Sequence, residues 1–288
     1  MSSQLVHLNG ETLPLDQAKI SVMDRGFLFG DGVYEVIPVY ARQLFRAREH
    51  LRRLNDSLTA IKLPNPHTNE AWLALIQSIV VAQSSEDQWV YLQVTRGPSF
   101  RDHAFPAETH PTIFIMSNPL SMPAAALREQ GVSAITAEDN RWLRCDIKAT
   151  SLLANVLLRQ LSVEADAAET LVLRDGYLIE GSTSSAFIVT KGVIRTPAPS
   201  HLMLPGITYD VVLEICREQG LQHQVGPITE ADLRTADEVW ITSSNKEVLP
   251  VTRLDGQTVG DGQPGPVFKQ MYALYQAFKQ REMYGRSA

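Results

Sequence analysis

The chain has 288 residues, of which 44% are hydrophobic and 20% are charged, and this composition is ordinary for a globular protein. Its formal net charge of -6, without a cluster of Lys and Arg, argues against a nucleic-acid partner. The stretches richest in apolar residues, such as residues 76–82, are too short to span a bilayer, so we expect no contact with a membrane. A chain of this length favours about two domains.

The cysteines and the first residues bear on the compartment. Cys145 and Cys216 are far apart and form no CxxC motif, which favours a reducing compartment over a disulfide framework. Residues 1–5 show neither the cationic region nor the long apolar region of a secretory signal. We therefore expect a soluble cytoplasmic protein.

The first half of the chain alternates strands and helices. Residues 27–40 are predicted to form a strand entered through glycines, and residues 89–95 and 112–116 form two more. Apolar residues recur at helical spacing in residues 48–62 and again in residues 69–82. A polar loop follows residue 95, and two prolines flank a polar break near residue 120. We expect an N-terminal domain of residues 1–119, a linker of residues 120–123 and a C-terminal domain of residues 124–288.

Strands and helices continue beyond the linker. The patterns predict a helix after residue 151, two hairpins, a helix that opens at Gly206-Ile207-Thr208 and a C-terminal helix. The Asp175-Gly176 pair is typical of a tight hairpin turn. The predicted class is α+β.

The segment of residues 141–150 combines polar and cationic residues immediately before an apolar helical pattern. Lys148 lies in this segment, in the last loop before the helix. A lysine there is expected to be half-buried, which lowers its pKa and frees its amine for nucleophilic chemistry. The alternative is a solvated surface charge, which is the usual fate of a lysine.

Several common chemistries lack their motifs. The seven histidines show no HxH or HExxH spacing, so we expect no metal site. Gly30 and Gly32 do not make a dinucleotide fingerprint, because Glu35 stands where glycine is required and a strand follows. What remains is a set of hydroxyl-rich turns, including one at Ile207 and Thr208. There, a helix start could bind an anion or simply be capped.

These motifs together resemble the fold-type IV pyridoxal-phosphate aminotransferases, and most closely the D-amino-acid branch. The matching residues occur in the family's order along nearly the whole chain: Asp24-Arg25-Gly26, residues 30–36, Glu49-His50-Leu51-Arg52-Arg53-Leu54, Arg101-Asp102-His103, residues 141–148, Glu180-Gly181-Ser182, Gly206-Ile207-Thr208 and Thr242-Ser243-Ser244. The resemblance implies a small N-terminal α/β domain and a larger C-terminal domain with a mixed, barrel-like sheet.

The resemblance assigns the cofactor residues for pyridoxal 5'-phosphate. Lys148 would bind the cofactor aldehyde covalently and later move a proton between substrate and cofactor. Glu180 would face the pyridine nitrogen and keep it protonated, which makes the ring a better electron acceptor. The phosphate would be held by four residues: Arg53, Ile207, Thr208 and Ser244.

The resemblance also assigns the substrate residues. Arg101 and His103, reaching from the partner subunit, would bind the substrate α-carboxylate together with Tyr34. Because the lysine lies on one fixed face of the cofactor, the position of the carboxylate decides which enantiomer reacts. An Arg-x-His loop on this side implies D-amino acids, and a site shared between subunits implies a homodimer.

The expected reaction is ping-pong transfer of an amino group from a D-amino acid to a 2-oxo acid, for example from D-alanine to 2-oxoglutarate, giving D-glutamate. The alternatives of the same fold are a branched-chain L-aminotransferase, an amine transaminase and an aminodeoxychorismate lyase. A non-catalytic binding protein is the alternative of another class. Ser185 and Ser244 depart from the family's more usual Asn and Thr, and both keep a hydrogen-bonding group.

Overall fold

The computed structural model describes residues 4–284, which form two compact units. The first unit runs to Ser121 and also contains Ile147–Leu152, whereas the second contains Met122–Asp146 and continues from Leu153. The division after Ser121 falls within the predicted linker of residues 120–123. The short segment that carries Lys148 departs from the predicted division, because it packs with the first unit.

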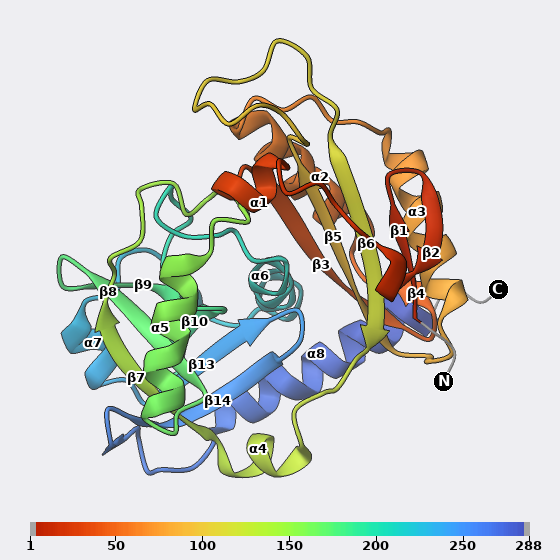
Figure 1. The fold of residues 1–288 in the computed structure, drawn as a ribbon. Coiled ribbons are helices and arrows are strands. Elements are labelled where there is room, and N and C mark those ends of the chain that lie inside the picture. Colours follow the sequence, from red (N-terminus) through yellow and green to blue (C-terminus); the bar gives the residue numbers. More distant parts are fainter. Residues whose placement is uncertain (1–3, 285–288) are drawn as a thin grey trace. The chain divides into compact units, whose positions relative to one another are not determined.

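The first unit is built on a six-stranded antiparallel sheet in the order β2-β1-β6-β5-β3-β4 (Figure 1). Its strands are β1 (Leu5–Leu8), β2 (Glu11–Pro14), β3 (Gly32–Tyr40), β4 (Gln43–Leu44), β5 (Gln88–Thr95) and β6 (Thr112–Pro119). A short 3-10 helix, η1 (Leu15–Gln17), follows β2. The long central pairings β3–β5 and β5–β6 fix the register of the sheet.

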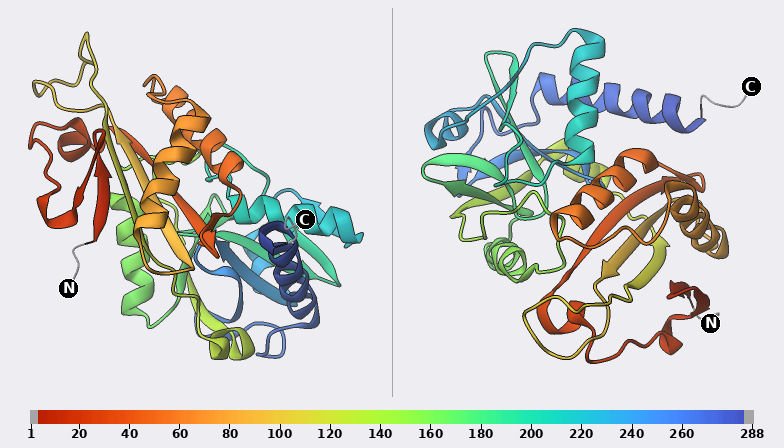
Figure 2. Two further views of the ribbon diagram at one scale, coloured as in Figure 1. Left: turned by 90° about the vertical axis from the view of Figure 1, so that its right-hand side faces the viewer. Right: turned by 90° about the horizontal axis from the view of Figure 1, so that it is seen from above.

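Helices α2 (Ala47–Ala60) and α3 (Asn69–Ala82) cover one face of this sheet (Figure 2). Their inner sides and alternate strand residues form one buried core, which includes Leu54, Trp72, Ile37 and Leu92. The period of 3.6 on the helices and 2 on the strands explains why the sequence pattern predicted both helices. The predicted bounds of α3 are confirmed.

The prediction of a strand from residue 27 onward is wrong at its start, because Arg25–Phe29 form a short helix, α1. The side chain of Asp24 caps this helix by accepting a hydrogen bond from the Gly26 N–H at 2.8 Å. Gly30 ends the helix in the left-handed conformation, with φ of 65°. The glycines therefore terminate a helix, and β3 starts only at Gly32.

The second unit contains a nine-stranded mixed sheet. Its strands are β7 (Val132–Glu138), β8 (Glu169–Arg174), β9 (Tyr177–Gly181), β10 (Ser185–Thr190), β11 (Val193–Thr196), β12 (His223–Val225), β13 (Glu238–Ser243), β14 (Glu247–Leu254) and β15 (Gln257–Thr258). They follow the order β12-β11-β10-β13-β14-β7-β8-β9, with β15 on β14. The predicted hairpin turn at Asp175-Gly176 is confirmed, since β8 pairs with β9 and both turn residues have positive φ.

Helices surround this sheet. Helix α5 (Leu153–Glu164) packs on β7 and β8, while α6 (Ile207–Gln219) and α8 (Pro266–Tyr284) pack on each other and on β13. The short helices α4 (Ala125–Gln130) and α7 (Glu230–Arg234) lie beside β14 and β9. Within residues 4–284, no helix is both long enough and apolar enough to cross a bilayer.

Strand β14 was not predicted, because Pro250 interrupts its pattern and proline normally excludes a central strand. The structure places Pro250 opposite Trp240 of β13, and the pairing of β14 with β7 begins only at Val251. The missing N–H of Pro250 therefore lies outside the β7 pairing.

Leu54 is fully buried between α2 and the sheet. We expect Leu54→Ala to lower the free energy of unfolding by about 2–5 kcal/mol, because truncation leaves a cavity in a packed core. Urea denaturation would measure this, with Arg52→Ala, an exposed position on the same helix, as the matched control. Equal losses in both variants would contradict the packing described for α2.

Candidate functional site

Lys148 is half-buried, as predicted, and its backbone pairs with the start of β3. The Tyr34 N–H donates to the Lys148 carbonyl at 3.0 Å, and the Thr150 N–H donates to the Gly32 carbonyl at 2.9 Å. The Lys148 N–H donates to Ser57 Oγ of α2 at 3.2 Å. Its Nζ lies 4.1 Å from the centre of the Tyr34 ring. The predicted nucleophile and one predicted substrate residue thus lie side by side.

Arg53 is a buried residue of α2 and forms a two-pronged ion pair with Glu35 of β3. Arg53 Nε and Nη2 donate to the two carboxylate oxygens at 2.7 and 2.8 Å. His50, one helical turn earlier, places Nδ1 2.7 Å from the same carboxylate. The pairing fixes the guanidinium plane of the residue predicted to bind phosphate.

This cluster shifts the pKa of both of its titratable members. Burial opposes ionisation of Glu35, but Arg53 and His50 outweigh it and hold the pKa of that carboxyl well below its usual range. Burial lowers the pKa of His50, although the charge of Glu35 opposes that shift. His50 is therefore neutral at pH 7, and it donates its Nδ1–H to the carboxylate.

Arg101 and His103 lie together on an exposed loop between β5 and β6. Both contact Phe29 of α1: the Arg101 guanidinium is 5.3 Å and the His103 ring 5.5 Å from the centre of its ring. Tyr34, the third predicted substrate residue, instead lies against Tyr91, with 5.6 Å between the ring centres.

Glu180, at the end of β9 in the second unit, is buried and pairs with Arg141. Arg141 Nη1 donates to Glu180 Oε1 at 2.6 Å, and the Leu204 N–H lies 3.3 Å from each carboxylate oxygen. Asp139 receives Arg141 Nε at 2.8 Å and also pairs with Arg174. Arg141 therefore bridges two carboxylates.

Burial raises the pKa of Glu180 to about 7, although Arg141 opposes that shift. Burial alone would lower the pKa of Arg141, yet Asp139 and Glu180 outweigh it and hold that pKa above its usual range. The guanidinium thus stays charged, and a further cation beside Glu180 would lower the pKa of its carboxyl and favour the ionised form.

The first turn of α6 carries Ile207 and Thr208, both buried. The first N–H groups of a helix have no partner within it, so this turn offers donors to an anion. The absence of a side chain at Gly206 matters here, because a Cβ would meet Ser185 Oγ at 2.7 Å. Ser244 lies half-exposed in the turn between β13 and β14.

A buried glutamate holds the hydroxyl-rich turn after Glu180. Glu169 accepts hydrogen bonds from the hydroxyls of Ser182, Thr183 and Ser184, and from Lys246 Nζ at 2.9 Å. Burial opposes its ionisation, but Lys246 and the hydroxyls hold the pKa of Glu169 below its usual range. The turn of residues 182–184, which follows Glu180, is therefore held by Glu169 of the same unit.

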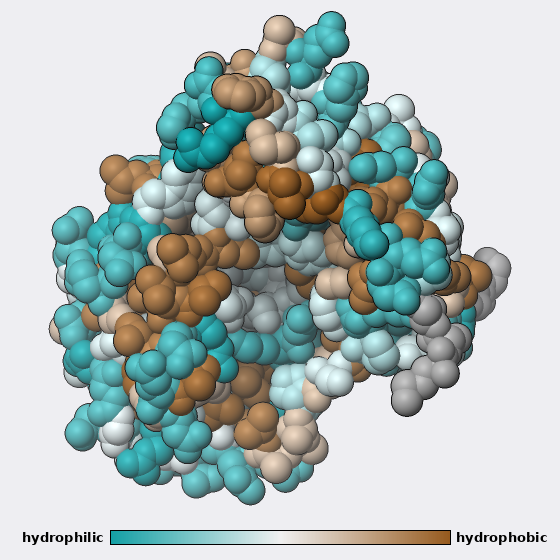
Figure 3. Space-filling view, viewed as in Figure 1, coloured by the Kyte–Doolittle hydropathy of each residue, from teal (hydrophilic) through white to brown (hydrophobic). Residues whose placement is uncertain are grey.

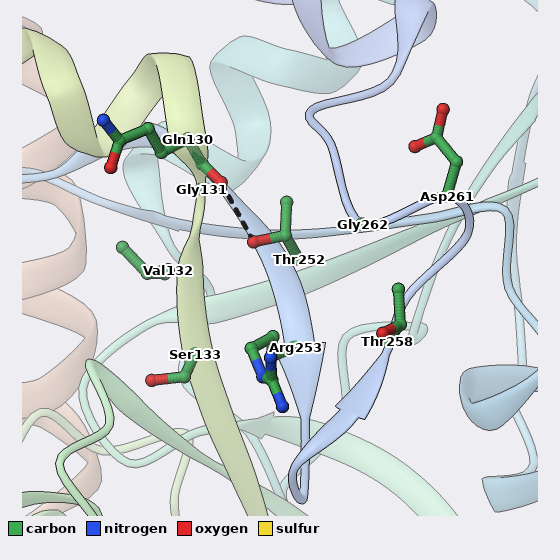
Figure 4. A pocket seen from close by; sticks show the side chains of 9 residues that line it. All are labelled: Gln130, Gly131, Val132, Ser133, Thr252, Arg253, Thr258, Asp261 and Gly262. Atoms are coloured by element: carbon green, nitrogen blue, oxygen red, sulfur yellow. Dashed lines mark hydrogen bonds between the residues drawn. The ribbon is translucent and has the colours of Figure 1, made fainter.

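Neither a metal site nor the pocket beside β14 involves the residues described above. Among residues 4–284, no group of three or more His, Cys, Asp or Glu side chains could hold a metal ion. A surface hollow of about 470 Å³ lies beside β14 and β7 and is lined by residues such as Ser133, Thr252 and Asp261 (Figure 4). None of the predicted site residues lines it.

Sequence reasoning named Lys148, Arg53 and Glu180 but assigned no role to three other buried carboxylates that hold the region. Glu35, Asp139 and Glu169 each lie on or beside a strand, and each pairs with a residue distant in sequence. Two local signals were present: the spacing of His50 and Arg53, which places both on the same side of α2, and the pairing of Asp139 with Arg141 two residues later.

The buried ion pair predicts an acid-sensitive contribution to stability. The pKa of Glu35 is lowered in the folded state, so its stabilising effect is complete above the unfolded value of 4.5 and declines as the pH falls below it. We expect Glu35→Gln to lower the free energy of unfolding by about 3–5 kcal/mol at pH 7, because Arg53 is left buried without its counter-charge.

Urea denaturation of both proteins from pH 7 to pH 3 would test this, with Glu11→Gln at an exposed strand position as the control. The difference between wild type and Glu35→Gln should narrow at the acid end. A difference that is constant with pH would show that the carboxylate charge does not contribute.

Comparison with known proteins shows the family to which the chain belongs. Residues 32–254 match the model of amino-transferase class IV. The chain is 40% identical over 271 residues to a D-alanine aminotransferase of Bacillus licheniformis, covering 94% of this chain and 95% of that protein. It is 38% identical over 274 residues to a D-alanine aminotransferase of Staphylococcus aureus (strain MSSA476), covering 95% and 97%.

Solved structures of aminotransferases have the same fold as this chain. The branched-chain amino acid aminotransferase of Escherichia coli has a TM-score of 0.89 at 27% identity, covering 96% of this chain and 94% of that one. The branched-chain amino acid aminotransferase of Thermoproteus uzoniensis, solved with norvaline, has a TM-score of 0.86 at 26% identity, covering 99% and 96%. The predicted two-domain fold-type IV architecture is confirmed. On the family model and on relatives that match nearly its full length, the chain belongs to the class IV aminotransferases.

Proposed function

We propose that this chain is a pyridoxal-phosphate-dependent D-amino-acid aminotransferase that moves the amino group from a D-amino acid to a 2-oxo acid by a ping-pong route. The observation that carries the proposal is the 40% identity to a D-alanine aminotransferase over 94% of the chain. D-Alanine and 2-oxoglutarate are the proposed substrate pair. The proposal includes roles for residues of both units, which are taken in turn below.

The donor set in the second unit fits a phosphate. The N–H groups of Ile207 and Thr208 open a 13-residue helix, and an anion is stabilised at such a helix start. The hydroxyl of Thr242 is buried, and no partner for it is found among the described residues. It lies opposite Ser185 in the pairing of β10 with β13, beside the turn that carries Ser244. Arg53 of the first unit is the proposed charged donor.

The environment of Glu180 fits a protonated pyridine nitrogen. A buried carboxyl whose pKa is raised to about 7 gains most from a cation that replaces lost hydration. When bound, pyridoxal phosphate supplies an electrophilic carbon for the amino group and a ring that accepts electrons from the substrate Cα. Arg141 and the Leu204 N–H fix the carboxylate that would face this ring.

Lys148 is the proposed catalytic residue. Its amine would bind the cofactor covalently and, once displaced by substrate, carry a proton to and from the substrate Cα. Its backbone is held at two points, by the Tyr34 N–H and by Ser57 Oγ, and the pairing of Thr150 with Gly32 holds the segment two residues later. The side chain is therefore the only part of the residue that must move.

The proposed carboxylate-binding residues are Arg101, His103 and Tyr34. A guanidinium and an imidazole next to each other offer directed donors to a carboxylate. Because Lys148 would serve one face of the cofactor, a carboxylate bound by these residues would present the Cα–H of the D-enantiomer to the amine.

A homodimer is the proposed functional unit, with Arg101 and His103 acting in the partner's site. The outer side of α5 supports an interface, since it exposes a row of large apolar side chains: Leu153, Val156, Leu157 and Leu161. Figure 3 shows this apolar patch over α5. Apolar patches on a protein surface mark interaction sites more often than chance.

The proposed compartment is the cytoplasm. Cys145 and Cys216 are both free and buried, and burial raises the pKa of each thiol to about 11. Neither thiol is poised for disulfide chemistry.

A branched-chain L-aminotransferase is the second candidate. It is favoured by the similarity in structure to enzymes of that type at 26–27% identity. The higher sequence identity to D-alanine aminotransferases favours the D-specific reading.

The enantiomer preference is directly measurable. We expect D-alanine to bleach the absorbance band of the bound cofactor within the first turnover, and L-leucine to leave it unchanged. Bleaching by L-leucine alone would replace the D-amino-acid proposal with the branched-chain one. A purified protein that binds no cofactor would contradict both.

Borohydride reduction followed by peptide mapping is the accompanying control. The cofactor should be fixed on Lys148 in the wild type and on no residue in Lys148→Ala. Lys62→Ala, a change of another lysine in the same unit, should behave as the wild type.

Arg101→Ala should separate substrate binding from cofactor binding. We expect the KM for D-alanine to rise about 10- to 100-fold, because one charge-assisted hydrogen bond to the carboxylate is lost. The cofactor spectrum should not change. Steady-state kinetics would measure this against Glu108→Ala, an exposed change on the same loop. Loss of cofactor together with substrate binding would show that the loop has another role.

A further inference from the structure

Asp31, between α1 and β3, binds two buried arginines at once. Arg25 Nε and Arg96 Nε both donate to its Oδ2 at 2.8 Å, and Arg96 Nη2 donates to Oδ1 at 3.0 Å. Burial opposes ionisation of Asp31, but the two guanidinium groups outweigh it and hold the pKa of this carboxyl below its usual range. The three side chains form a fixed ionic cluster.

Arg25 extends from this cluster to the loop that carries Arg101 and His103. Its Nη1 donates to the carbonyls of Asp102 and Ala104 at 2.6 and 3.2 Å, and its Nη2 donates to the carbonyl of His103 at 3.5 Å. One side chain therefore holds three consecutive carbonyls of the loop. Such bonds fix the backbone path on which the direction of the His103 side chain depends.

Arg96, in the same cluster, also contacts Phe105 of the loop and the end of α2. Its guanidinium lies 3.8 Å from the centre of the Phe105 ring, at the far side of the loop. It also donates to the carbonyls of Ile61 and Lys62 at 2.7 and 3.3 Å, at the end of α2. The loop is thereby tied to the helix that carries Arg53.

The ring of Phe29 in α1 contacts the side chains of Arg101 and His103. The Arg25 guanidinium lies 4.8 Å from the centre of its ring, in addition to the Arg101 and His103 contacts described above. Its neighbour Phe27 points away, with 68% of its surface exposed. One short helix thus supports both the backbone and the side chains of the loop.

The loop also closes on itself at its base. The Arg25 N–H donates to the Gly97 carbonyl at 3.0 Å, and Gly97 has φ of 85°. A side chain at Gly97 would collide with the carbonyl of His110, so the two ends of the loop lie against each other. Its position is set by contacts within its own unit.

We propose that Arg25, Asp31, Arg96 and Phe29 form a clamp that positions Arg101 and His103 for the substrate carboxylate before any partner subunit or substrate binds. These are positioning residues and not catalytic ones, since they act through the loop. The inference rests on the proposed function for its kinetic consequence, whereas the order of the loop can be measured without substrate.

The physical advantage is preorganisation. An exposed loop that must be ordered on binding loses affinity to conformational entropy, and a loop ordered beforehand does not. Because Arg25 and Arg96 direct their donors to Asp31 and to backbone carbonyls, they hold the loop without presenting those donors to the substrate.

The test uses the holoenzyme with three single variants: Arg25→Met, Phe29→Leu and the matched control Phe27→Leu. Hydrogen exchange of the amides in residues 99–105 should be faster in Arg25→Met than in the wild type and unchanged in Phe27→Leu. The KM for D-alanine should rise about 10- to 100-fold in Arg25→Met and about 3- to 10-fold in Phe29→Leu. The kcat and the cofactor absorbance should not change.

A double variant shows whether Phe29 acts through Arg101. In the Arg101→Ala background, Phe29→Leu should raise the KM by a smaller factor than in the wild-type background. An equal factor in both backgrounds, unchanged exchange in Arg25→Met, or a fall in kcat at constant KM would overturn the clamp. If the wild type does not react with D-alanine, the proposed function fails, and the exchange measurement still decides whether the clamp exists.

Discussion

The pairing of Lys148 and Thr150 with the start of β3 is the constraint on which the first unit's part of the site depends. Strand β4 covers only Val39 and Tyr40, so the edge of β3 near Gly32 is left open. The backbone of Lys148 and Thr150 forms hydrogen bonds with this edge of β3. A lysine that lies in sequence among residues of the second unit is thereby held on the first unit's sheet, beside Tyr34.

The first half of β3 also positions the other proposed site residues of the first unit. Asp31 directly precedes β3 and binds the arginines that hold the loop, while Glu35 lies in β3 and binds Arg53. Alternate residues point to opposite faces, so Tyr34 faces Tyr91 while Glu35 faces α2. A shift of one residue in the register of β3 would exchange these faces and disrupt both groups of contacts.

Local patterns could be predicted from the sequence, and distant pairings could not. Helix α3 has an apolar face and a Thr68 cap, and both signals are local. Helix α1 was missed because its cap and its terminating glycine resemble the entry to a strand. Strand β14 was missed because the tolerance for Pro250 depends on where β7 begins to pair. The pairing of Lys148 with β3 involves residues more than a hundred positions away, so the local hydrophobic periodicity could not predict it.

The same limit explains which site residues were found. Arg53 and Glu180 were assigned roles by the resemblance, whereas their ion-pair partners were not: Arg53 is paired with Glu35, and Glu180 with Arg141, which also binds Asp139. Since each guanidinium is already opposed by a carboxylate, what it contributes to a bound anion or carboxylate is a fixed direction more than a net charge. A guanidinium keeps a fixed orientation when a buried carboxylate accepts its hydrogen bonds, and the fold brings that carboxylate to it. The orientation of these two arginines therefore depends on buried carboxylates, among them Glu35 and Asp139, for which no role in binding is proposed.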